Sequence, residues 1–280
     1  MVKRGHVRRN FGVFLIVLVL ALLSVIIMYP FIWTLINSLK SSIDFEMNPM
    51  GFPSRLMFSN YVDAWGVANV GLYTFNSLLV AGPTVVLVIL ISLLGAFVFA
   101  FQEFKLKMIL YIYVISGFAI PIEVVVIPLF FQMRDYHLLN TYWSVILPQS
   151  ALLLPFGVLI IRSFMLNVDR AIIDAARIDG CSSFRLLFSV VIPCIVPAIT
   201  SLLIFSFMWT WNSLFLPMVM ITRNEIRTLP LGLTYFQGQY GTNITLLSAA
   251  SVMACLPVII IYLIFQGQFI RGITAGAVKA

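Results

Sequence analysis

The chain has 280 residues, of which 61% are hydrophobic and only 10% are charged. Because soluble domains carry about 25% charged residues, this composition excludes an ordinary soluble protein and indicates an integral membrane protein. The net charge of +7 does not indicate a nucleic-acid-binding surface, since the basic residues are dispersed between apolar segments. The three cysteines and two histidines show no spacing typical of a disulfide framework or a metal site.

The first apolar run, residues 11–36, follows a basic N-terminal segment. It is longer than the apolar part of a signal peptide, which is about 7 to 15 residues, and no small-residue cleavage site follows it. It is therefore predicted to be an uncleaved transmembrane helix. Helices satisfy their own backbone hydrogen bonds in lipid, so we predict an all-α fold with six transmembrane helices, at residues 11–36, 72–101, 108–131, 143–162, 197–221 and 246–269.

The distribution of lysine and arginine predicts the orientation. Twelve of the 17 lie in segments on the same side as the N-terminus and five on the other, and cytoplasmic loops carry the excess of basic residues. We therefore expect a cytoplasmic N-terminal segment (1–10), a membrane domain (11–269) in contact with membrane lipid, and a cytoplasmic tail (270–280). The outer segments are 37–71, which is long and polar, 133–142, which is short, and 222–245, whose prolines and glycines predict an irregular loop or a broken short helix.

The most polar part of the second half, residues 164–193, lies on the cytoplasmic side and is predicted to be a hairpin of two short helices. Asp169 is a plausible N-cap for the first helix, and Gly180 suits the left-handed position that ends it. Arg170 and Asp174, four residues apart, are expected to pair. The apolar residues Ile172, Ile173 and Ala176 are expected to share one face.

The second helix of the hairpin is predicted to begin at a Ser182 or Ser183 cap and to carry an apolar stripe. The stripe has helical spacing and consists of Phe184, Leu187, Phe188 and Val191. Pro193 is expected to end this helix or to begin the fifth span. From the residues alone two interpretations stay open: an interfacial linker with its apolar face in the headgroups, or a rigid connection between the membrane and a soluble partner.

The hairpin sequence resembles a known motif. The run Asp174-Ala175-Ala176-Arg177-Ile178-Asp179-Gly180, followed after nine residues by Val190-x-Ile192-Pro193, is similar to the EAA loop of binding-protein-dependent ABC importer permeases. It departs from the family pattern in having Asp174 for Glu, Cys181 for Ala, and Val190 and Ile192 for Ile and Leu.

The resemblance extends along most of the chain and is closest to the smaller, six-span subunit of maltose-type permeases. It includes Trp211-Asn212 in the fifth span, although Ser213 stands where Asp is usual. The other matching segments are 29–33, 37–40, Asn76-Ser77-Leu78, Leu139-Asn140-Thr141-Tyr142 and 271–279.

The resemblance implies a type I ABC importer permease fold in a bacterial plasma membrane. It implies half of a pathway for a sugar or oligosaccharide, working with a second permease subunit, two ATPase subunits and an extracellular solute-binding protein. The residues implied to contact the ATPase are Asp174, Ala175, Ala176, Arg177, Asp179 and Gly180. The chain has no phosphate-loop motif and no catalytic constellation, so it is not expected to be an enzyme; ATP and magnesium are expected on the ATPase, with no cofactor on this chain.

Three residues are candidates for the translocation pathway. Glu123 is the one acidic residue well inside an apolar span, and such residues usually face a cavity; alternatively, Pro121 and Pro128 break the helix there and Glu123 satisfies freed backbone groups or contacts the partner permease. Asn212, with Trp209 or Trp211, could hold a sugar through an amide and an aromatic face; alternatively, Asn212 ties two helices together.

Three other functions remain open from the sequence. The cargo could be another polar solute, such as glycerol phosphate. A secondary transporter driven by an ion gradient would tolerate changes in the hairpin, although no internal repeat supports it. An adaptor protein without a pathway is a third, weaker reading.

Overall fold

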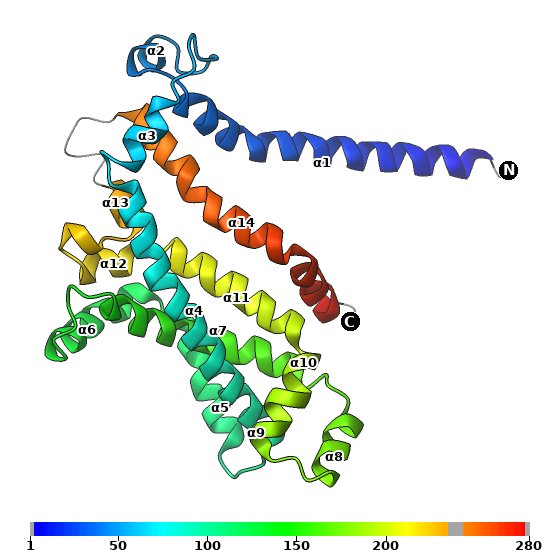
Figure 1. Ribbon diagram of the computed structural model, residues 1–280. Helices are drawn as coiled ribbons and strands as arrows, with labels where there is room; N and C mark the ends of the chain where they lie inside the picture. Colours follow the sequence, from blue (N-terminus) through cyan, green and yellow to red (C-terminus); the bar gives the residue numbers. More distant parts are fainter. Residues whose placement is uncertain (1–2, 235–242, 278–280) are drawn as a thin grey trace. The chain divides into compact units, whose positions relative to one another are not determined.

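The computed structural model describes residues 3–234 and 243–277, with the backbone alone at 3–12 and 269–277. This part of the chain is helical and contains no strand, which confirms the predicted fold class. The chain divides into two compact units, Met1–Asn69 with Tyr235–Met253, and Val70–Thr234 with Ala254–Ala280. The helix α14 (Ile244–Ala277) contributes to both units, which are described separately (Figure 1).

The first unit contains the long helix α1 (Lys3–Ser38), then α2 (Ser42–Met47) and α3 (Ser59–Trp65). The end of α1 is fixed by side chains from the segment that follows. Asn60 Nδ2 donates to the carbonyls of Ser38 and Lys40, each at 2.8 Å, and the buried Lys40 Nζ donates to Asn48 O at 2.7 Å. The segment that follows α1 is therefore folded, and the amide of Asn60 satisfies a carbonyl at the end of the helix.

The second unit begins with α4 (Val70–Phe101) and α7 (Trp143–Met165), which cross closely, and α11 (Val196–Trp211) packs against both (Figure 1). At the crossing, an ideal Cβ on Gly157 would lie 2.1 Å from Ser92 Oγ. Small residues at such a point let two helix backbones approach. The unit is completed by α5 (Lys107–Ser116), η1 (Gly117–Ala119), α6 (Ile122–Asp135), α8 (Arg170–Ile178), α9 (Ser183–Arg185), η2 (Leu186–Val191), α10 (Ile192–Cys194), α12 (Phe215–Met220), η3 (Asn224–Ile226), α13 (Leu229–Thr234) and the rest of α14.

Four described helices are long and apolar enough to cross a membrane: Val13–Ser38, Val70–Phe101, Trp143–Met165 and Ile244–Gln268. The predicted third span is not one straight helix, because α5 and η1 end before Pro121 and α6 leaves at an angle of 101°. The predicted fifth span, 197–221, is also wrong as a single helix: α11 ends at Trp211 and α12 begins at Phe215. The chain also turns by 82° before α11, between Ser183–Cys194 and Val196–Trp211. Six spans result if each of the two bent pairs counts as one.

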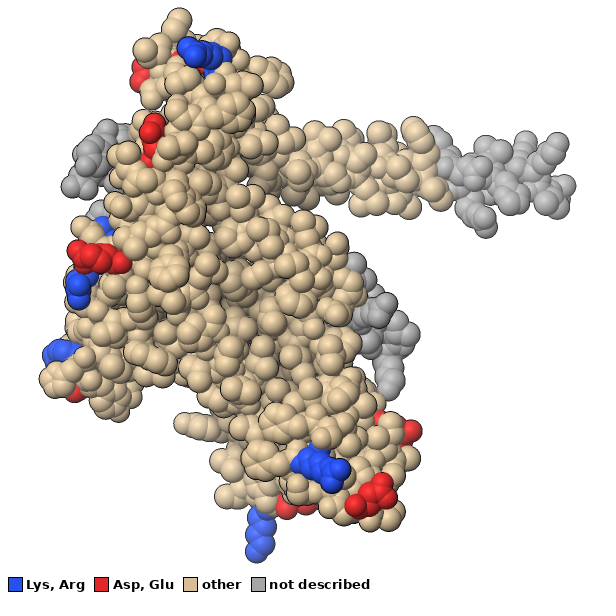
Figure 2. Space-filling model, viewed as in Figure 1, with Lys and Arg blue, Asp and Glu red and all other residues tan. Residues whose placement is uncertain are grey.

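Charged side chains in the second unit lie near its two ends. On the face shown in Figure 2 they gather around the α8–α9 region and around α6, α12 and η3, and the surface between is almost free of charge. This is the pattern expected of helices whose middle portions face lipid.

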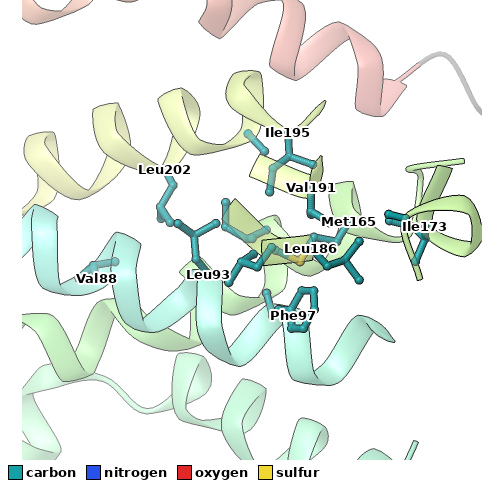
Figure 3. Packing of buried hydrophobic residues seen from close by; sticks show 14 of the residues in the cluster. Val88, Leu93, Phe97, Met165, Ile173, Leu186, Val191, Ile195 and Leu202 are labelled. Atoms are coloured by element: carbon teal, nitrogen blue, oxygen red, sulfur yellow. The ribbon is translucent and has the colours of Figure 1, made fainter. Parts of the chain in front are cut away.

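Two buried apolar clusters hold the second unit. One, toward the hairpin, joins α4, α7, α8, η2 and α11 and includes Leu93, Met165, Ile173, Leu187 and Leu202 (Figure 3). The other, toward the opposite end of α4, joins α6, α7, α12 and α13 to α4. The same long helix is thus packed at both of its ends.

Candidate coupling hairpin

The first helix of the hairpin, α8, begins and ends where the sequence predicts. Asp169 Oδ1 accepts a hydrogen bond from Ala171 N at 2.9 Å, which is the predicted N-cap. At the other end Gly180 has φ +76°, Gly180 N donates to Arg177 O and Cys181 N donates to Ala176 O, both at 3.0 Å. These two bonds form a Schellman motif, so the turn after α8 is defined by its own backbone.

One face of α8 is part of the protein interior. Ile173 is 3% exposed and Ala176 is 8% exposed, and Figure 3 places Ile173 beside Met165 at one end of the cluster. Ala176, predicted to contact an ATPase, thus faces this protein's own core. The prediction that Ile172 shares this face is wrong, because Ile172 is 46% exposed.

The second half of the hairpin departs from a regular α-helix. Ser182 Oγ accepts from Arg185 N at 3.3 Å, which confirms the predicted cap. Residues Leu186–Val191 then form a π-helical segment, η2, whose i→i+5 hydrogen bonds change the angular spacing of side chains. The predicted stripe is split as a result: Leu187 and Val191 are buried, whereas Phe184 and Phe188 are exposed and stacked on one another.

Pro193 does not end the helical segment but lies within the first turn of α10. A proline is tolerated there because the amide hydrogens of a first turn have no partner within the helix. The break falls two residues later, at Ile195, before α11.

The outer face of α8 is exposed. It presents Asp174, Ala175, Arg177 and Ile178, of which Ile178 is 86% exposed, and the exposed Asp179 and Gly180 follow directly after the helix. The predicted ion pair between Arg170 and Asp174 is not formed; the ion pairs found among described residues lie elsewhere.

Arg177 has a specific partner inside the protein. Its Nη2 donates to the carbonyl of Phe101, the last residue of α4, at 3.2 Å. Two residues earlier on α4, Phe99 O accepts a hydrogen bond from Arg162 Nε of α7 at 3.1 Å, and the Arg162 guanidinium lies 4.2 Å from the ring centroid of Tyr111. The last carbonyls of a helix lack partners within the helix and carry partial negative charge, so both arginines satisfy the end of α4.

The three pathway candidates lie in different environments. Glu123 is exposed in the first turn of α6, directly after the bend at Pro121. Asn212 is exposed at the end of α11, and its Nδ2 donates to Met208 O of the same helix at 2.8 Å, not to a second helix.

Trp211 is placed differently from the other two candidates. It is 2% exposed, and its Nε1 donates to Ala254 O of α14 at 3.1 Å. Its ring therefore joins two helices and presents no face to a solute, while Trp209 is 40% exposed.

Sequence reasoning missed a polar cluster at the opposite end of α4. Asn76 Nδ2 donates to the carbonyls of Glu225 and Arg227, each at 2.9 Å, and its Oδ1 accepts from Tyr142 Oη at 2.7 Å. Burial raises the pKa of Tyr142, so the hydroxyl stays protonated as a donor at neutral pH. Next to it, Ser77 Oγ accepts from Leu229 N at 2.7 Å.

Asn140 also binds the segment that Asn76 and Ser77 contact. It has φ +59°, and its Oδ1 accepts from Thr222 N and Oγ1 and from Arg223 N. In the sequence, Asn76, Ser77, Asn140 and Tyr142 were noted only as parts of a resemblance. Their partner, the segment 222–229, could not be identified from the sequence.

Residues 89–275 match the model of the family described as binding-protein-dependent transport system inner membrane component. The chain belongs to this family. It is therefore a multi-pass membrane permease subunit of an ABC importer, not an enzyme.

Similar curated proteins cover nearly the whole permease. The arabinooligosaccharides transport system permease AraQ of Bacillus subtilis is 34% identical over 276 residues, which is 96% of this chain and 98% of that protein. The diacetylchitobiose uptake system permease NgcG of Streptomyces coelicolor is 32% identical over 262 residues, covering 93% and 87% of the two chains.

The fold is shared with a solved structure, that of a bacterial ABC transporter involved in the import of the acidic polysaccharide alginate. The match has a TM-score of 0.79 and 22% identity and covers 93% of this chain and 97% of that one. It supports the predicted importer permease fold.

Proposed function

We propose that this permease forms half of the pathway of an ATP-driven importer for a sugar or oligosaccharide and docks its ATPase through the outer face of α8. The observation that carries the proposal is a short helix whose Ile173 and Ala176 are fixed in the core, while Asp174, Ala175 and the residues from Arg177 to Gly180 are exposed. A buried face keeps the helix in one position relative to the membrane helices, and the exposed face remains available to a partner.

The complete importer would contain a second permease subunit, two ATPase subunits that bind ATP and magnesium, and an extracellular solute-binding protein. A related structure supports the last of these: a bacterial alginate ABC transporter in complex with an alginate pentasaccharide-bound periplasmic protein, matched with a TM-score of 0.69. In this proposal both termini and α8 lie on the cytoplasmic side, where an ATPase has access to ATP; the excess of lysine and arginine in these segments supports that orientation.

The proposal of a sugar cargo is supported by the names of the similar permeases. They include proteins for arabinooligosaccharides, diacetylchitobiose and sulfoquinovosyl glycerol. Uptake of radiolabelled arabino-oligosaccharide and diacetylchitobiose by cells with and without the gene tests this class. Uptake of glycerol phosphate in place of both would overturn it.

The docking face is tested by a matched pair of substitutions. Ile178→Glu places a charge on the most exposed apolar side chain of α8, at 86% exposure, whereas Ile172→Glu places it on a different face of the same helix at 46% exposure. We expect Ile178→Glu to reduce copurification of the ATPase and Ile172→Glu to retain it. Equal copurification in both variants and in the wild type would contradict docking through this face.

A further inference from the structure

We infer that Arg177 is a positioning residue that joins α8 to α4, so that movement of the hairpin reaches the outer segment 222–229 through one continuous helix. This rests on the proposed function, in which α8 docks the ATPase. It changes the role of Arg177, which the family resemblance implied to contact the ATPase.

The first step is the contact itself. Arg177 Nη2 donates to Phe101 O at 3.2 Å, and Arg162 Nε donates to Phe99 O at 3.1 Å. Together with the two carbonyls, these side chains form what we call the α4 end cap. A hydrogen bond from a charged donor to a helix-end carbonyl is favoured by the partial charge there, and the two donors come from α8 and α7, not from α4 itself.

The second step is the apolar packing that holds α8 near the same end of α4. Ile173 and Ala176 lie in the buried cluster that also contains Phe97, one turn from the end of α4, and within it α8 packs mainly against η2. The apolar contact holds α8 against the core but allows sliding. The bond from Arg177 fixes α8 to a single atom at the end of α4.

The third step is the opposite end of α4, which is attached just as specifically. Asn76 donates to Glu225 O and Arg227 O, and Ser77 accepts from Leu229 N. The 32 residues of α4 run between the two attachments as one helix with Pro83 inside it. Each residue adds about 1.5 Å to the length of the helix, so α4 alone spans the distance between the hairpin and segment 222–229.

The inference predicts that Arg177 can lose its bond without losing the ATPase. Arg177→Gln removes the charge and shortens the donor, and Arg177→Lys keeps a charged donor that can reach a carbonyl. Arg170→Gln is the matched control, since Arg170 lies on the same helix, is exposed, and its side chain makes no hydrogen bond or ion pair with the described residues.

The experiment uses the complete importer, with both permeases, the ATPase and the binding protein, in lipid vesicles. Three quantities are measured: copurification of the ATPase, amide hydrogen exchange in peptides covering 98–103 and 170–180, and the ratio of ATP hydrolysis with the binding protein to hydrolysis without it. In Arg177→Gln we expect unchanged copurification, exchange in both peptides faster by roughly three- to tenfold, as for one lost hydrogen bond, and a stimulation ratio reduced by roughly threefold or more. Arg177→Lys is expected to restore most of the ratio, and Arg170→Gln to match the wild type.

The outcomes separate the two proposals. If the wild-type permease neither copurifies with an ATPase nor supports stimulated hydrolysis, the proposed function fails. If the wild type does both and Arg177→Gln keeps the wild-type ratio and exchange, the end-cap inference fails while the function stands. Loss of ATPase copurification in Arg177→Gln, but not in Arg177→Lys, would overturn it in favour of docking by charge.

Discussion

The crossing of α4 and α7 at Gly157 makes a quantitative prediction. A Cβ at residue 157 would lie 2.1 Å from Ser92 Oγ and 3.0 Å from Ser92 Cβ. The hydroxyl can rotate away, but the Cβ of Ser92 is fixed to the backbone of α4, so Gly157→Ala forces the two helices apart. Overpacking of this kind costs about 1–3 kcal/mol.

A second substitution, Ser92→Gly, is expected to restore part of the stability that Gly157→Ala loses. Ser92 is fully buried and its Oγ has no hydrogen-bond partner within the described part of the chain, so Ser92→Gly sacrifices no hydrogen bond and removes both clashing atoms. Its own cost is the lower helix propensity of glycine, at most about 1 kcal/mol. The next neighbour, Leu202 Cδ1, is 3.4 Å away and needs little adjustment.

The assay is thermal unfolding of the purified permease in detergent, for the wild type, both single variants and the double variant. Gly157→Ala is expected to lower the midpoint by roughly 2–10 °C, and the double variant is expected to recover part of that loss, with a coupling free energy of about 1 kcal/mol or more. A wild-type midpoint for Gly157→Ala, or strict additivity in the double variant, would refute this account of the crossing.

Four further predictions follow from single contacts. Trp211→Phe loses the hydrogen bond to α14, so we expect a loss of about 0.5–1.5 kcal/mol in unfolding free energy; a midpoint unchanged from the wild type would contradict it. Gly180→Ala places a Cβ at φ +76° and should cost about 1–2 kcal/mol, seen as faster amide exchange in the hairpin, whereas Gly180→Asn should cost less. Asn76→Ala leaves two carbonyls and a tyrosine hydroxyl without their partner, and faster exchange at 224–232 is the expected sign; protection equal to the wild type would count against the attachment. The pKa of Glu225 is lowered below 4.5, first by a hydrogen bond to its own backbone and then by Arg223. The ionised carboxylate therefore contributes to order in segment 222–229 at neutral pH, and this contribution is lost as the pH falls below 4.5 through the lowered pKa. Glu225→Gln should show no such pH dependence.

The helix caps and the turn of the hairpin, which depend on neighbours in the sequence, were predicted well, whereas the predicted ion pair between Arg170 and Asp174 was not found. Asp169, Gly180 and Ser182 each act on backbone groups two to four residues away, and such effects are visible in a short window of sequence. The exposed positions of Ile172, Phe184 and Phe188 were not predicted, because they depend on how α8 meets the core and on the π-helical segment, which changes the spacing of the side chains.

The transmembrane spans likewise combine features that the local sequence predicts with features that depend on the fold. Hydropathy identified six apolar segments, but a window of apolar residues does not sense a change of direction. A break at Pro121 and Pro128 was offered only as an alternative; the 101° bend falls at Pro121, whereas Pro128 lies inside α6. The partner of Arg177 lies 76 residues away on α4, and the partners of Asn76 lie about 150 residues away. No spacing rule brings such pairs together without the fold.

Import into vesicles of defined composition tests the central claim most directly. The vesicles contain both permeases and the ATPase, and they are loaded with ATP and magnesium or with neither. The solute-binding protein and labelled arabino-oligosaccharide or diacetylchitobiose are added outside. A proton or sodium gradient is applied to a parallel set of vesicles. The account predicts accumulation only with internal ATP, and its loss when the ATPase is omitted or Ile178→Glu is introduced. Accumulation driven by the ion gradient without the ATPase would contradict it.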